Sequence, residues 1–599
     1  MQNRVFRGSL LFLPFILLLT TYGIGQVSVP EWAKDAVWYQ VFPERLRNGD
    51  PSNDPTKEEL EMPADRAWQV SRWTSDWYEL QPWERAFNPN FYENVFERRY
   101  GGDLQGVLDR LDYLADLGIN AIYFNPVFEA ISLHKYDASS YHHIDNNFGP
   151  NPKADLEQIA REIDDPATWR WTAADSVFLK LIREAHARGI RIIIDGVFNH
   201  SGTRFFAFED VRKNQQKSRY ADWYDIVRWD NPATPQDEFD WKGWWGYKPL
   251  PELHEDKNGF VPAVKQYFFN ITKRWMDPNG DGDPSDGIDG WRLDVANEVS
   301  DVFWKEWRKL VKSINPNAYI VGEIWDDASK WLSGDQFDAV MNYRFARASV
   351  KFFVNSGRKK LSVSEFDREL AEIRRSYPEE INYVLQNLLD GHDTDRLASM
   401  ILNPNRDYDR DAGLRSNANY DVSKPREEHW RVLRLMALFQ MTYLGAPMIY
   451  YGTEAGMWGG DDPDDRKPMV WPDLNYEDER THPISGTARP ADRVEFDHRL
   501  FAYYKKLVDI RKENAALRRG SFKTLLADDK NDVYAFERSL GTDKTVVVLN
   551  NSVRTQRVEI EVDAKFKEVL TNARMGSNGR ISGVVVPGKT GLVFVKQAQ

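Results

Sequence analysis

Cysteine is absent from this chain of 599 residues, which excludes disulfide bonds, zinc–thiolate sites and lipid attachment at a cysteine. Basic residues are not in excess either: 79 Lys and Arg stand against 92 Asp and Glu, for a formal net charge of −13. Nucleic-acid binding therefore has no electrostatic support. The apolar run at residues 10–19 is too short for a comfortable membrane span, so we expect no stable membrane insertion.

The N-terminus has the pattern of a secretory signal peptide. Arg4 and Arg7 precede the apolar run, and the small residues Gly23 and Gly25 predict cleavage before Gln26. Residues 1–25 would then be removed and the protein would be secreted or periplasmic. An uncleaved N-terminal anchor remains the alternative.

Strand-like and helix-like segments alternate along most of the chain. Apolar, β-branched runs at residues 36–42, 119–128 and 188–198 predict buried strands, and helical patterns follow at 103–117, 175–189 and 302–314. This alternation predicts an α/β fold with a parallel sheet, and eight such units make a (β/α)8 TIM barrel.

Two regions depart from this alternation. Residues 201–264 are rich in Trp, Pro, Asp and Gly and form an insert after the third strand. Beyond about residue 518 the pattern changes to short alternating or apolar runs, which predict a C-terminal antiparallel β-domain at 518–599. The catalytic barrel would span 26–517 and include the insert.

Four short segments place polar groups where predicted strands end. They are DGVFNH (195–200), GWRLDVANE (290–298), VGEIW (321–325) and LLDGHDTDR (388–396). A single Asp or His at a strand end is usually structural, but catalytic groups collect at the carboxyl ends of barrel strands. The four segments together therefore predict an active site.

In this order the segments resemble the α-amylase family, glycoside hydrolase family 13. The resemblance implies Asp294 as the nucleophile, following Arg292, with Glu323 as general acid/base and Asp393 as a third carboxylate. It also implies that His200 and His392 contact sugar hydroxyls. The family's inserted domain B would correspond to residues 201–264.

Retaining cleavage of a glycosidic bond needs two carboxyl groups about 5–5.5 Å apart, one ionised and one protonated. Arg292 lies two residues before Asp294, on the same face of the strand, and we expect it to lower the pKa of Asp294. Glu323 would supply the proton.

Two further motifs match the family's sugar-binding positions. HKYD (134–137) implies that Tyr136 stacks under the sugar at the cleavage point, and GGDDPDDRKPM (459–469) implies that Asp462 and Arg466 grip its outer hydroxyls. By spacing alone, this last pair would also fit a surface salt bridge.

Oxygen-rich residues recur in NGDPSND (48–54) and GGD (101–103), a composition that suits Ca²⁺. Cyclodextrin-acting members of the family bind calcium at a loop of this form. The resemblance implies a structural Ca²⁺ held by Asn48, Asp50, Asn53, Asp54, Gly101 and Asp103. A plain Asx-rich turn is the alternative. A second acidic loop, 277–287, has Ile288 where an EF-hand needs Glu, and metal binding there stays open.

Departures from the common α-amylase pattern indicate which subfamily this chain resembles. Asn297-Glu298 replaces the usual Lys-His, and ANE, LPEL (250–253) and residues 323–343 resemble cyclomaltodextrinases and neopullulanases. These enzymes usually carry an extra N-terminal β-domain, which we do not expect here because the first strand starts near residue 36. The oligomeric state stays open.

We therefore expect a secreted retaining hydrolase of α-1,4 bonds in cyclodextrins, pullulan or maltodextrins. A plain α-amylase, an α-glucosidase and a transglycosylase remain alternatives, as does a non-catalytic glycan-binding protein.

Aromatic residues make up 13% of the chain, including 22 Trp, and sugar rings stack well on indole. An aromatic insertion after the first strand carries Trp68, Trp73, Trp77, Tyr78 and Trp83. Either it forms a sugar-binding platform or it is a mini-core that lets a long loop fold on itself, and the mini-core is the favoured interpretation.

Overall fold

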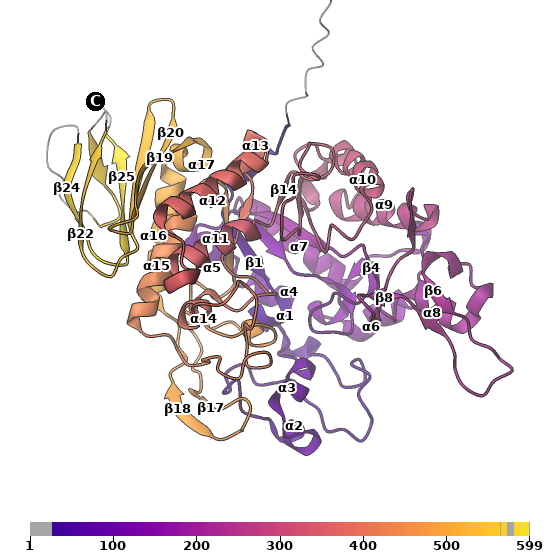
Figure 1. Cartoon of the computed structure of the whole chain (residues 1–599). Coiled ribbons are helices and arrows are strands. Elements are labelled where there is room, and N and C mark those ends of the chain that lie inside the picture. The colour runs from indigo at the N-terminus through magenta and orange to yellow at the C-terminus, as the bar shows by residue number, and fades with distance from the viewer. Residues whose placement is uncertain (1–26, 563–564, 572–579, 598–599) are drawn as a thin grey trace, which may run out of the picture.

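A computed structural model describes residues 27–562, 565–571 and 580–597 (Figure 1). The predicted signal peptide lies outside these residues. Across the part of the chain that is described, no helix combines the length and apolar character needed to cross a bilayer.

The central element is an eight-stranded parallel sheet in the order β14-β13-β12-β5-β2-β1-β16-β15. A parallel bridge from Met341 to Gln386 joins the two edges and closes the barrel. The predicted (β/α)8 fold is confirmed. The strands are β1 (Trp38–Val41), β2 (Ala121–Phe124), β5 (Arg191–Gly196), β12 (Gly290–Leu293), β13 (Tyr319–Gly322), β14 (Ala339–Val340), β15 (Gln386–Asn387) and β16 (Ala446–Tyr450).

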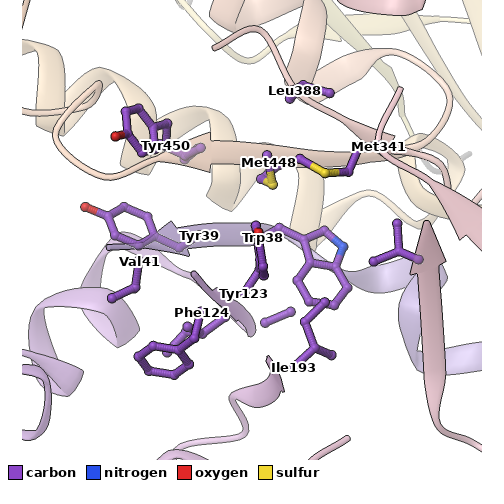
Figure 2. Close-up of a cluster of buried hydrophobic side chains, with 14 of the residues drawn as sticks. Trp38, Tyr39, Val41, Tyr123, Phe124, Ile193, Met341, Leu388, Met448 and Tyr450 are labelled. Atoms are coloured by element: carbon purple, nitrogen blue, oxygen red, sulfur yellow. The ribbon is translucent and has the colours of Figure 1, made fainter. Parts of the chain in front are cut away.

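Large apolar side chains fill the barrel because its strands are buried on both faces. Trp38 is fully buried, and its ring stacks on Tyr319 with 5.1 Å between centroids. Figure 2 shows Trp38 together with Ile193, Met341 and Met448, which come from three other parts of the barrel wall. Burying one such side chain contributes about 1.5–3 kcal/mol.

The helices that cover the sheet begin at clear capping signals. Thr172 and Asp175 form a capping box at the start of α7, and Ser300 caps α10. The helix predicted at 103–117 is divided into α4 and α5, because Asp109 and Arg110 leave the helical run. The main helices are α4 (Leu104–Leu108), α5 (Leu111–Leu117), α7 (Ala173–Ala187), α9 (Pro262–Met276), α10 (Asp301–Ile314), α11 (Tyr343–Phe353), α12 (Val363–Ser376), α15 (Glu427–Thr442) and α16 (His498–Glu513).

The insert after β5 contains one α-helix, two 3-10 turns and short hairpins, and it lies at the edge of the molecule (Figure 1). The LPEL segment pairs with the end of the DGVFNH motif through an antiparallel bridge from Glu252 to His200, and a second bridge joins Leu253 to Tyr224. The insert thereby holds the backbone of His200, which is predicted to contact the sugar. Its elements are α8 (Phe206–Asn214), β6 (Ile226–Arg228), β7 (Asp240–Trp241), β8 (Gly243–Trp244), β9 (Tyr247–Pro251), β10 (Glu255–Asp256) and β11 (Gly259–Phe260).

The C-terminal region is antiparallel, as predicted. Along β20 (Val533–Leu540), Tyr534 and Phe536 pack into the barrel core, whereas Val533 and Ala535 face a second apolar cluster. This alternation is the period of two that a strand imposes. The five-stranded sheet has the order β19-β20-β21-β25-β23, and β22 pairs with β24. The other strands are β19 (Ser521–Asp528), β21 (Asp543–Asn550), β22 (Gln556–Glu561), β23 (Phe566–Glu568), β24 (Arg580–Val586) and β25 (Thr590–Lys596).

The aromatic insertion forms a mini-core, which confirms the favoured interpretation. Trp77 and Tyr78 are buried and pack against Phe91. The indole of Trp77 and the hydroxyls of Tyr78 and Tyr92 all donate hydrogen bonds to the buried carboxylate of Asp464.

Candidate active site

Strand register brings the predicted catalytic groups together. Arg292 on β12 lies opposite Asp195 on β5, and Leu293 lies opposite Gly322 on β13. Asp294 directly follows β12, and Glu323 directly follows β13. The Glu323 N–H donates to the Leu293 carbonyl. Asp294 and Glu323 therefore emerge side by side at the carboxyl end of the barrel.

The Arg292 guanidinium contacts three carboxyl groups. One of its terminal nitrogens, Nη1, lies 2.9 Å from both oxygens of Asp195 and 2.8 Å from Asp294 Oδ1. The other, Nη2, lies 3.0 Å from Glu323 Oε2. Arg292 and Asp195 are fully buried, and Asp294 and Glu323 are 7% and 6% exposed. We call these four residues the carboxylate–arginine cluster.

Glu323 is held at both carboxyl oxygens. Its Oε2 accepts a hydrogen bond from the Val295 N–H at 2.9 Å, and its Oε1 accepts one from the Trp325 indole at 3.1 Å. Val295 has φ 37°, a strained value for a β-branched residue, which the surrounding contacts must hold in place. The Trp325 ring stacks on Tyr343 at 3.9 Å. These contacts fix Glu323 beside Asp294.

The cluster has more acid groups than its single guanidinium can neutralise. Burial raises the pKa of Asp195 to about 6, although the Arg292 charge opposes this. Burial likewise raises the pKa of Asp294, and the negative charges of Glu323 and Asp195 add to the effect. Arg292 lowers the pKa of Asp294, as expected from the sequence, but burial outweighs this effect. Such a group of carboxyls favours retaining a proton.

A second wall of the site is formed by neutral polar rings. Tyr136 stacks in parallel on His392 with 5.6 Å between centroids, and its hydroxyl lies 2.5 Å from His392 Nε2. The Gln40 amide holds His392 Nδ1 at 2.8 Å. Burial lowers the pKa of His392 well below its ordinary value. The imidazole is therefore uncharged at neutral pH and suited to hydrogen-bonding hydroxyl groups.

Arg466 links the remaining predicted sugar ligands. Its guanidinium lies 3.3 Å from Asp393 and 3.2 Å from Asp462, and it donates to the His392 carbonyl at 2.8 Å. About one third of the Asp393 and Asp462 side-chain surface is exposed. The loop after β16 thus meets the loop after β15, and both leave carboxylate oxygens accessible.

His200 ends the DGVFNH motif, directly before the domain B region. Its ring stacks on Trp244 at 5.7 Å, and Trp244 stacks in turn on Trp245, which is 80% exposed. His200 Nε2 is buried without a hydrogen-bond partner. Burial lowers the pKa of His200 to about 4, so this ring is also neutral. Its free nitrogen can accept or donate one bond to a sugar.

The predicted calcium residues come from two segments that lie side by side, together called the Asx loop: Asn48, Asp50, Asn53 and Asp54 from the first, and Gly101 and Asp103 from the second. Asn48 Oδ1 and Asn53 Oδ1 are buried without hydrogen-bond partners. The Asp103 carboxylate accepts the backbone N–H groups of Gly49 and Asp50. The Asp50 carboxylate, by contrast, accepts from Ser52 N, which caps the turn.

Two observations fit a cation in the Asx loop. Gly101 has φ 70°, and a Cβ there would come 1.9 Å from Asp54 Oδ1, so only glycine leaves this space free. Burial, together with the nearby charges of Asp103, Glu44 and Asp50, raises the pKa of Asp54 to about 6, and the Asn48 amide opposes this. Unpartnered oxygens and crowded carboxylates are a donor set that suits Ca²⁺.

The other acidic loop, residues 277–287, is held largely by its own backbone, although Asp277 Oδ1 and Asp286 Oδ1 are also buried without hydrogen-bond partners. The carboxylates of Asp277, Asp281 and Asp283 accept N–H groups of the loop itself. This is a series of Asx turns.

Several site residues were not singled out from the sequence. Asp195 opens a motif that was recognised, and Trp325 closes another, so the signal was present for both. Tyr123, whose hydroxyl donates to Asp195 at 2.7 Å, and Gln40 are polar groups within buried strands. A polar residue in a fully apolar strand was the available clue.

Comparison with known families agrees with this geometry. Residues 40–165 and 173–520 match the alpha amylase catalytic domain, and residues 525–594 match the alpha amylase C-terminal all-beta domain. The chain belongs to the α-amylase family of glycoside hydrolases. It is an enzyme of this family, of the neopullulanase and cyclomaltodextrinase type.

The relatives are similar over most of the chain. Neopullulanase 2 of Thermoactinomyces vulgaris is 40% identical over 89% of this chain and 72% of its own length. A cyclomaltodextrinase of Geobacillus thermopakistaniensis is 35% identical over 94% of this chain and 76% of its own. A solved cyclomaltodextrinase structure, 33% identical, superimposes with a TM-score of 0.69 and covers 95% of this chain and 79% of its own.

Proposed function

We propose that this protein cleaves α-1,4-glucosidic bonds in cyclodextrins, pullulan or maltodextrins, with retention of configuration, through a covalent glycosyl-Asp294 intermediate. The observation that carries the proposal is the single guanidinium of Arg292, which contacts both Asp294 and Glu323. It pairs a nucleophile and an acid within one buried cluster.

The reaction takes two steps. In the first, Glu323 gives its proton to the glycosidic oxygen while Asp294 forms a bond to the anomeric carbon and the leaving sugar departs. In the second, ionised Glu323 takes a proton from water, the water oxygen attacks the anomeric carbon and Asp294 is released. Arg292 stabilises whichever carboxylate is charged at each stage.

The other residues would hold the sugar at the cleavage point. Tyr136 offers a ring face, and His200 and His392 are neutral and can bond hydroxyls. Asp393 and Asp462, both oriented by Arg466, would bind outer hydroxyls. Contacts that tighten as the ring flattens lower the barrier rather than only the binding free energy.

We further propose that the Asx loop holds a structural Ca²⁺ and that the chain is exported. Asn48, Asn53, Asp54, Asp103 and the Gly101 carbonyl are the candidate ligands. The Asp50 carboxylate already has a partner within its turn, so its part would be secondary. Export rests on the signal-peptide pattern of residues 1–25, and the mature N-terminus isolated from producing cells should begin at Gln26.

The function is tested by incubating purified enzyme with cyclodextrin, pullulan, starch and maltose and measuring reducing ends. We expect release from cyclodextrin or pullulan. Tight glycan binding without turnover on any of these substrates would instead indicate a binding protein. Products longer than the starting sugar would indicate transglycosylation.

A further inference from the structure

A second buried polar site, separate from the carboxylate–arginine cluster, lies between strand β4 (Ala138–Ile144) and the segment before α7. His142 and His143 lie near the end of strand β4, and Glu162 lies beyond α6 (Pro152–Ile159), in the segment that leads to α7. One donor atom from each of the three residues lies within 4.8 Å of the other two. The side chains are 1%, 0% and 5% exposed.

The arrangement of donors fits a transition metal. His143 Nε2 lies 2.7 Å and His142 Nε2 lies 3.4 Å from the same Glu162 oxygen, Oε2. Ligands at about 2.0–2.1 Å around a tetrahedral zinc ion are about 3.3 Å apart, so these donors need to move little to share an ion. His142 Nε2 has no hydrogen-bond partner although it is buried. An unpaired buried nitrogen is costly, and a cation between it and the Glu162 carboxylate would give it a partner.

Both imidazoles are oriented by a partner on their other nitrogen. His143 Nδ1 lies 2.7 Å from Asp175 Oδ2, and His142 Nδ1 lies 2.9 Å from the Tyr267 hydroxyl. The His142 ring also stacks on Trp169 at 4.4 Å. Outer contacts of this kind fix the ring and direct the remaining nitrogen, as in histidine metal ligands.

A cavity adjoins two of the three residues. His142 and Glu162 line a cavity of about 530 Å³ together with Glu58, Glu59 and Glu209, the last of which pairs with Arg204. The acidic side chains Glu58 and Glu59 favour cations in this cavity. A water molecule in this cavity could occupy the fourth position of a site with three protein ligands.

We propose that His142, His143 and Glu162 bind one Zn²⁺ ion, which ties strand β4 to the segment before α7. Two imidazoles and one carboxylate are a donor set that zinc accepts. The site is structural: it braces strand β4, which starts two residues after Tyr136, and its ligands are separate from the Asx loop and from the catalytic groups. The proposal does not depend on the hydrolase activity.

The test starts from chelator-treated, full-length protein titrated with Zn²⁺ alone, followed by calorimetry and elemental analysis. We expect about one tightly bound ion per chain and a raised thermal midpoint. His142→Gln and Glu162→Gln should each weaken binding by about 100-fold or more. His186→Gln is the matched control, because His186 pairs with Asp289 at 2.7 Å outside this site, and it should bind like the unmodified chain.

If the variants fail to fold, crystals of the unmodified protein soaked in Zn²⁺ test whether the ion binds at the proposed site. An anomalous peak between His142, His143 and Glu162 would support the proposal. It is overturned if zinc binds elsewhere, for example at the active-site histidines, or if the three side chains keep only a proton-bridged contact. Unchanged affinity in both folded variants would overturn it equally.

Discussion

The carboxylate–arginine cluster and the Asx loop both gather acid groups, but they balance the charge in different ways. In the first, Arg292 supplies a cation from the chain itself and contacts Asp195, Asp294 and Glu323. In the second, no ion pair among the described residues involves Asp50, Asp54 or Asp103. Asn48 and Asn53 there leave oxygens unpartnered.

This difference fits two different tasks. A fixed guanidinium cannot leave, so the catalytic carboxyls keep their geometry while a proton moves between them and the substrate. The Asx loop, by contrast, would depend on an ion from solution under the proposal made above, so its order should follow the free concentration of that ion. The first cluster should therefore govern rate, and the second should govern stability.

The largest expected effect is on rate. Asp294→Asn and Glu323→Gln should each lower kcat by at least about a thousandfold while the melting curve is retained, because each removes a group that acts on the reacting bond. Glu323→Gln should partly recover on an aryl glycoside with a good leaving group, which needs less protonation, and Asp294→Asn should not. Glu298→Gln, an exposed acid near the nucleophile, is the control and should be unaffected. If both catalytic variants responded alike to the leaving group, the assigned roles would be wrong.

Arg292→Met should destabilise the fold by about 3–5 kcal/mol, because it leaves buried carboxylates without their cation. Adding Asp195→Asn should recover part of this loss, since fewer charges then remain unpaired. Denaturant unfolding measures both. Arg426→Met, which removes an exposed arginine, should change stability by less than about 0.5 kcal/mol. No difference between the two arginine variants would contradict the role of Arg292.

Calcium removal should act on stability and spare catalysis. A chelator should lower the thermal midpoint, and Ca²⁺ should restore it better than Mg²⁺, whose octahedral demand fits the loop poorly. The stabilisation is about 2.7 kcal/mol when free ion exceeds the Kd 100-fold. Asp54→Asn should lose this response, whereas Asp281→Asn, in the other acidic loop, should keep it. An unchanged melting curve in chelator, with no calcium found beforehand, would exclude the site.

The smallest effect is a pH dependence of calcium binding. The pKa of Asp54 is raised to about 6 from an ordinary 3.8, so the ion-free folded state binds a proton more tightly than the unfolded chain. Acidification from pH 6 to pH 4 should therefore stabilise the ion-free protein at this residue. Calcium affinity should fall through the same range, because the proton competes for the carboxylate. Titrations at pH 5, 6 and 7 test this, and an affinity that does not change would contradict it.

Much of the barrel could be predicted because its signal is local. The strands at 36–42, 119–128 and 188–198 are apolar runs. Each motif that carries predicted site residues is a short contiguous segment, such as DGVFNH at the end of the third strand. The structure adds what depends on distant segments. Trp325 stacks on Tyr343, and the Gln40 amide hydrogen-bonds His392. Each contact joins side chains from different strands and loops.

Other features could not be inferred from residue patterns. The positive φ of Val295 is a property of the folded backbone, and nothing in the residue type indicates it. The pKa of Asp294 depends on how strongly burial raises it and how strongly Arg292 lowers it, and both effects depend on the folded surroundings. In the structure, burial outweighs the lowering expected from Arg292. Glu162 approaches His143 from an irregular segment 19 residues away.

The central claim is that Asp294 forms the covalent intermediate. A fluorinated α-glucosyl fluoride, which forms such an intermediate quickly and releases it slowly, should inactivate the enzyme with one label per chain. Peptide mass mapping should then place the sugar on Asp294, and the Asp294→Asn variant should stay unlabelled. A label on another carboxylate, or turnover that yields the inverted anomer with no labelling, would contradict the account.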